Sequence, residues 1–88
     1  MLALALAAAG PAAAARRATD RGLVLRVRVS AIVLRELDGT RQRFRVGPAT
    51  IGTLDGRPAT ILDLQRGDVA FVQHFRMLAA FRIRAFSR

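Results

Sequence analysis

Charged and apolar residues alternate with period two on both sides of Asp38-Gly39, between Arg21 and Val46. This alternation is typical of antiparallel strands with one buried face, and Asp-Gly is a common turn between such strands. On the first strand Arg26 and Arg28 alternate with Leu25 and Val27. The sequence therefore predicts a small β-barrel or sandwich that has one apolar face and one arginine face.

The turn at Asp38-Gly39 can have two lengths, and the cost of burying an arginine distinguishes them. A two-residue turn pairs Val33 with Phe44 and puts Arg35 in the core, whereas a three-residue loop over 37–39 pairs Ile32 with Phe44 and turns Arg35 outward. Burying an unpaired arginine costs several kcal/mol, but two arginines facing each other on a wet surface cost only about 0.2–1 kcal/mol. We therefore expect the three-residue loop, with Gly39 in the left-handed region.

Composition limits what can hold the chain together and what it can bind. The chain has 88 residues and no cysteine, so hydrophobic packing must stabilise a single small domain without disulfides or thiolate metal sites. All 15 basic residues are arginine, and the net charge is +9. Codon usage in a GC-rich genome explains arginine in place of lysine, and selection for the planar guanidinium, which binds phosphate bidentately, is the alternative. Codon usage does not explain the excess of positive charge.

The first 15 residues predict an export signal. They carry no charged side chain, their apolar run is too short to span a bilayer, and Gly10-Pro11 is followed by an alanine-rich cleavage stretch. We expect residues 1–15 to be a signal peptide, 16–21 a lead-in and 22–87 a single domain, exported to the periplasm or beyond the cell. The alternatives are a retained N-terminal helix in a cytoplasmic protein, or a true start upstream of Met1.

The remaining residues predict five or six strands in an all-β, OB-like antiparallel barrel. The first strand covers about 23–29, with Leu23 facing the core, and passes through a bend at Ser30-Ala31 into 32–36. After the 41–46 strand, a short hairpin turns at Asp55-Gly56, and a helical turn begins near Thr60, where Asp63 fits a capping box. The last strands cover 69–75 and 79–86. Three phenylalanines are expected in the core: Phe71, Phe75 and Phe81. For Phe75, as for Phe86, the alternative is an exposed position near the end of its strand.

Several turn and core motifs carry a resemblance to a known family. They are Leu37-Asp38-Gly39, Asp55-Gly56-Arg57-Pro58-Ala59, Asp63-Leu64-x-x-Gly67-Asp68-Val69 and the final Ala80-x-x-Ile83 strand. Together, over residues 21–86, they resemble a family of small exported bacterial barrels that are similar to OB-folds and are classed as of unknown function. The resemblance implies a five- or six-stranded barrel outside the cytoplasm and implies no catalytic residue.

The titratable residues do not form a pattern typical of an enzyme. His74 is the single imidazole, and the aspartates mostly occupy turns, where they stabilise the backbone locally. No two carboxylates are spaced as an acid/base couple, and neither serine has a neighbouring histidine. We therefore expect a protein with no catalytic residues, metal, cofactor or small-molecule substrate.

The arginine face is the feature most suited to binding. The candidate polyanion-binding residues are Arg26, Arg28, Arg41, Arg43, Arg45, Arg82 and Arg84. For an exported chain, anionic envelope polymers or lipids are the expected ligands, bound with a steep dependence on salt. One alternative is a structural or protein-interaction module that uses a sheet edge. Another is a cytoplasmic single-stranded nucleic-acid-binding protein, although the phenylalanines expected in the core would leave no stacking platform.

Overall fold

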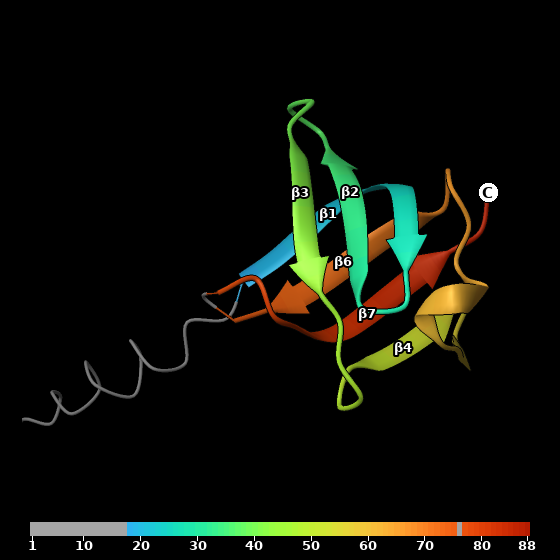
Figure 1. Ribbon diagram of the computed structural model, residues 1–88. Coiled ribbons are helices and arrows are strands. Elements are labelled where there is room, and N and C mark those ends of the chain that lie inside the picture. Colours follow the sequence, from blue (N-terminus) through green and yellow to red (C-terminus); the bar gives the residue numbers. More distant parts are fainter. Residues whose placement is uncertain (1–17, 76) are drawn as a thin grey trace, which may run out of the picture.

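The computed structural model describes residues 18–75 and 77–88. Within them the protein is all-β, and a single sheet has the strand order β3-β2-β1-β6-β7-β4-β5 (Figure 1). The elements are β1 (Ala18–Arg28), β2 (Ala31–Glu36), β3 (Arg41–Arg45), β4 (Ile51–Leu54), β5 (Arg57–Pro58), the 3₁₀ turn η2 (Ile61–Asp63), β6 (Val69–His74) and β7 (Ala80–Phe86). The sheet curls, so that side chains from its two halves meet in a common core.

Strand β1 is longer than expected and changes phase in its middle. It begins at Ala18, so residues 18–21 are not a lead-in but pair with the end of β6. The register against β2 shifts between Val24 and Arg26, which leaves Leu25 as a bulge. Before the bulge Val24 is the buried residue and Leu23 faces outward, which corrects the expected placement of Leu23 in the core. After the bulge the expected phase returns, and Val27 packs against the core.

The connection between β1 and β2 is a tight hairpin and not the expected bend. Arg28 pairs with Ala31, so Val29 and Ser30 form a two-residue turn. No Gly or Pro marks this turn, and the irregularity of β1 lies instead at Leu25. Val29 is consequently 77% exposed.

The register of the β2–β3 hairpin is as predicted. Ile32 pairs with Phe44 and Arg35 with Arg41, which requires the three-residue loop over 37–39. Gly39 has a φ of 89°, in the left-handed region. Ile32 and Phe44 are fully buried, and the arginines of β3 are exposed.

The predicted short hairpin and helical turn are both present. Strands β4 and β5 pair through Thr53 and Pro58, and the turn places Asp55 and Gly56 at positive φ. At the start of η2 the Asp63 carboxylate accepts a hydrogen bond of 2.8 Å from the Thr60 backbone N–H. This hairpin and η2 together cover one end of the sheet.

The aromatic core differs from the prediction. On β6 the buried residues are Ala70, Val72 and His74, so Phe71 lies on the opposite, outward face. Phe75 is 42% exposed, and Phe81, which lies beside the register shift between β6 and β7, is only half-buried. These two rings pack on each other, with centroids 4.7 Å apart. Phe44 is therefore the phenylalanine of the buried core.

The sheet is open. Its two edge strands are β3 and β5, and a single parallel bridge between Arg45 and Ala79 links the end of β3 to the start of β7. The expected signal peptide, residues 1–15, lies outside the described residues. In the described part of the chain, no helix is long and apolar enough to cross a membrane.

Replacing Gly22 with alanine should destabilise the fold. A Cβ at this position would overlap the backbone carbonyl of Arg35 on β2, and backbone cannot give way as a side chain can. We expect Gly22→Ala to lower the free energy of unfolding by about 1–3 kcal/mol, measured by urea denaturation with circular dichroism. Gly47→Ala is the matched control, because its Cβ would meet nothing within 4 Å. Equal unfolding midpoints for the two variants would contradict this packing.

Candidate polyanion-binding surface

The outward arginines of the first three strands form rows across the sheet. Facing residues on neighbouring strands lie about 5 Å apart, so the two arginines of a row lie either on adjacent strands or on the two sides of one β2 residue. The register gives the rows Arg28–Ala31–Arg45, Arg26–Val33–Arg43 and Arg35–Arg41. All six arginines are exposed. Arg35, which was not among the predicted binding residues, belongs to the same surface.

Three of these arginines line a hollow with an apolar floor. Arg26, Arg28 and Arg43 surround a depression of about 440 Å³ whose remaining lining residues are Ala31 and Val33. Ala31 is almost fully buried beneath them. Guanidinium groups that meet over a small apolar floor suit an anionic group, because each can donate two parallel hydrogen bonds to phosphate or carboxylate oxygens. We call this depression the arginine hollow.

Carboxylates do not face outward from the described strands. Asp38 and Asp55 occupy turns and Asp63 belongs to η2. Asp68 is buried, and its carboxylate accepts a hydrogen bond from the Gln65 backbone N–H. The other two acidic residues, Asp20 and Glu36, share the inward phase of their strands with Val72 and Leu34. No carboxylate therefore lines the arginine hollow. Asp20, Glu36 and Asp38 instead border a separate depression, together with Arg21 and Phe71.

Arg82 and Arg84 do not join the arginine hollow, because β6 separates β7 from β1. The predicted set is thus divided in two. Across β1, β6 and β7, Arg21, Phe71 and Arg84 form one row. The guanidinium carbons of Arg21 and Arg84 lie 5.9 and 5.5 Å from the centroid of the Phe71 ring, within the range of cation–π attraction.

Phe86 extends this second surface. Its ring meets Phe71 edge-on, with centroids 5.9 Å apart, and it is 40% exposed. The outward face of β6 and β7 therefore combines two aromatic rings with arginine. This surface was not predicted from the sequence, because Phe71 was expected in the core.

His74 is buried and both of its ring nitrogens are engaged. Nδ1 lies 2.8 Å from the carbonyl oxygen of Phe75, and Nε2 lies 2.9 Å from a carboxylate oxygen of Asp20. Both partners are hydrogen-bond acceptors, and the contact between Nε2 and the Asp20 carboxylate is an ion pair when the ring is protonated. The ring also packs on Phe44 with centroids 4.9 Å apart. This arrangement joins β1 to β6 and presents no free imidazole nitrogen.

Glu36 lies near this ion pair at the same end of the sheet. Burial raises the pKa of Glu36, the negative charges of Asp20 and Asp38 raise it further, and His74 opposes them with a smaller lowering effect. The ionised form of Glu36 is therefore in an unfavourable electrostatic setting.

The described residues include no group of three or more His, Cys, Asp or Glu side chains that could hold a metal ion.

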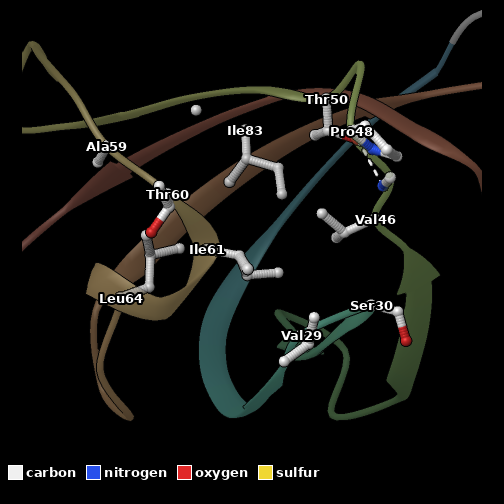
Figure 2. Close-up of a pocket in the computed structure, with 12 residues that line it drawn as sticks. Val29, Ser30, Val46, Pro48, Thr50, Ala59, Thr60, Ile61, Leu64 and Ile83 are labelled. Carbon is white, nitrogen blue, oxygen red and sulfur yellow. Dashed lines mark hydrogen bonds between the residues drawn. The ribbon is translucent and has the colours of Figure 1, made fainter.

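An apolar cavity of about 460 Å³ opens where the sheet is interrupted (Figure 2). Figure 2 shows Val46, Ile61 and Ile83 converging on it from three separate segments of the chain. The β1–β2 turn closes another side through Val29. The Thr50 hydroxyl on the border of the cavity donates a hydrogen bond of 2.8 Å to the Ala80 carbonyl oxygen. No charged side chain lines the cavity.

Comparison with known proteins finds no relative of this chain. No family model, no curated protein and no solved structure matches the chain. The resemblance to exported OB-like barrels therefore stays a prediction from its motifs.

Replacing Glu36 with glutamine should stabilise the protein at neutral pH. A carboxyl whose pKa is raised on folding opposes folding when it is ionised. Its cost is therefore present at neutral pH and disappears as the pH falls below the ordinary pKa of a glutamate in the unfolded chain. We expect Glu36→Gln to raise the unfolding midpoint at pH 7 and to have little effect at pH 3, measured by thermal denaturation. A midpoint lowered at pH 7, or a gain that persists at pH 3, would contradict this reading.

Proposed function

We propose that this protein is a non-enzymatic binding module that holds anionic polymers or lipids of the cell envelope on its arginine surface. The observation that carries the proposal is the arginine hollow. It brings Arg26 and Arg28 of β1 and Arg43 of β3 around one depression, and Arg41 and Arg45 flank it on the same strand. No carboxylate lines this depression, so a polyanion meets no repulsive group within it.

Export is part of this proposal. It rests on the composition of residues 1–15, which is typical of a signal peptide. An exported chain meets phosphorylated glycans and lipid headgroups rather than nucleic acid, so these are the ligands that we favour.

The alternative of a protein-interaction module that uses a sheet edge has less support. Edge strand β3 carries Arg41, Arg43 and Arg45, and edge strand β5 consists of Arg57 and Pro58. Charges and proline on an edge oppose the addition of another strand. Binding through the outward face is therefore favoured over binding through an edge.

We also propose that the open sheet is an interrupted OB-like barrel. The chain from β3 to β4 pairs first with β2, then touches β7 through the Arg45–Ala79 bridge, and finally pairs in parallel with β7 at Ile51. Residues 41–54 thus behave as one strand that is broken in the middle. The apolar cavity lies at this break.

Charge reversal in the arginine hollow should weaken polyanion binding. We expect Arg26→Glu with Arg43→Glu to reduce the affinity for heparin, a soluble sulfated polyanion, by about tenfold or more and to flatten its dependence on salt. The measurement is fluorescence anisotropy over a series of salt concentrations. Arg57→Glu with Arg66→Glu is the control of equal charge, since both residues are exposed and lie outside the hollow. Equal losses in the two double variants would show only a general effect of net charge.

A second candidate function is single-stranded nucleic-acid binding, and the outward position of Phe71 favours it. Such proteins combine basic side chains with aromatic rings on which bases stack. Phe71 and Phe86 offer rings on the face that also carries Arg21 and Arg84. This candidate requires that the chain stay in the cytoplasm.

The two functions separate at Phe71. If bases stack on this face, Phe71→Leu should weaken binding of an oligo-thymidine by about fivefold or more, because stacking contributes about 1–3 kcal/mol per base. Heparin binding should be unchanged. Phe75→Leu is the control, because Phe75 is an exposed ring on a different segment. Similar oligo-thymidine affinities for native protein and both variants would exclude this use of Phe71.

A further inference from the structure

The apolar cavity and the arginine hollow adjoin each other at the β1–β2 turn. Arg28 and Ala31 line the hollow, and the two residues between them, Val29 and Ser30, line the cavity. On the neighbouring strand, Arg45 directly precedes Val46, another residue of the cavity. A cationic surface thus passes into an apolar space within a few residues.

The cavity has the size and lining of a ligand site. Pockets for small ligands typically occupy about 300–1,000 Å³ and are mostly apolar, and this one has about 460 Å³. Its border is polar only through backbone groups and the hydroxyls of Ser30, Thr50 and Thr60. The Thr50 and Thr60 hydroxyls already donate hydrogen bonds, to the Ala80 carbonyl and the Asp63 carboxylate. Such a lining accepts hydrocarbon and offers little to a polar ligand.

The residues around the rim of the cavity indicate what chemical group could lie outside it when a hydrocarbon chain lies inside. Val29 is 77% exposed and connects the cavity with the hollow. The Arg45 guanidinium lies 3.5 Å from the Met77 carbonyl oxygen, which is too long to hold it firmly. An anionic headgroup next to Val29 would therefore meet Arg28 without competition from a carboxylate in either lining.

We propose that the cavity binds the alkyl chain of an anionic amphiphile with one hydrocarbon tail, and that Arg28 holds its headgroup. This inference rests on the proposed function, because Arg28 belongs to both sites, and it names the ligand class more closely. A single-chain anionic lipid satisfies the charge of the hollow and the apolar lining of the cavity together. A soluble polyanion fills only the hollow.

The first test is calorimetric titration of the full chain with dodecyl phosphate, below the concentration at which it forms micelles. We expect saturable binding with one ligand per chain. Inorganic phosphate, which lacks the tail, and dodecyltrimethylammonium, which has the same tail and a positive head, should each bind at least about tenfold more weakly. Equal binding of the positively charged amphiphile would overturn the role of Arg28. Equal binding of inorganic phosphate would overturn the role of the cavity.

Variants then locate the two ends of the ligand. Ala59→Leu places extra volume in the cavity and should weaken dodecyl phosphate binding by about tenfold. Ala49→Leu is the matched control, because Ala49 is exposed and does not line the cavity. Arg28→Glu should weaken binding of dodecyl phosphate while the cavity is unchanged. If Ala59→Leu does not fold, Val29→Ser at the exposed rim tests the same contact, and it should also weaken binding.

Heparin distinguishes this inference from the function on which it rests. Loss of dodecyl phosphate binding in Ala59→Leu, with heparin binding retained, supports the amphiphile site. No binding of dodecyl phosphate by a native chain that binds heparin overturns the amphiphile site and leaves the polyanion proposal in place. Binding of dodecyl phosphate without any binding of heparin overturns the polyanion proposal instead.

Discussion

The exclusion of guanidinium groups from the core determines the register of the β2–β3 hairpin, and the rest of the structure depends on that register. An arginine cannot lose its charge, so the free energy needed to bury it without a partner is larger than the difference in stability between the two turns. Arg35 therefore faces water, and Ile32 and Phe44 pair inward. Their side chains form the centre of the core against which Val72 and Ile83 pack. The same alternation places the arginines of β3 on the outside, where they border the arginine hollow.

The regions that the sequence predicted well are those in which charge marks one face. The β2–β3 register and the outward arginines followed from alternation alone. Strand β6 lacks this mark, because both of its phases are largely apolar over Val69–Val72, and the choice between Phe71 and Val72 depends on the strands packed against it. In β1 the bulge at Leu25 reverses the phase, and local propensity does not locate such a bulge.

The candidate sites differ in how much of each could be predicted from the sequence. The arginines around the hollow come from two alternating strands, so their common face was visible in the pattern. The apolar cavity was not, because its lining comes from the β1–β2 turn, the segment after β3, η2 and β7. Those segments meet only after the sheet has curled. The pairing of Asp20 with His74 joins residues 54 positions apart and likewise depends on the completed sheet.

The outward face carries its charge entirely on arginine, and this has a consequence for how any ligand would be released. A guanidinium keeps its proton at every pH at which a protein stays folded, whereas phosphate monoesters gain a proton near pH 6. Acidification therefore leaves the charge of the arginines unaltered and reduces only the negative charge of the ligand. A pH dependence of binding would report the ionisation of the bound molecule, and its midpoint would help to identify the anionic group.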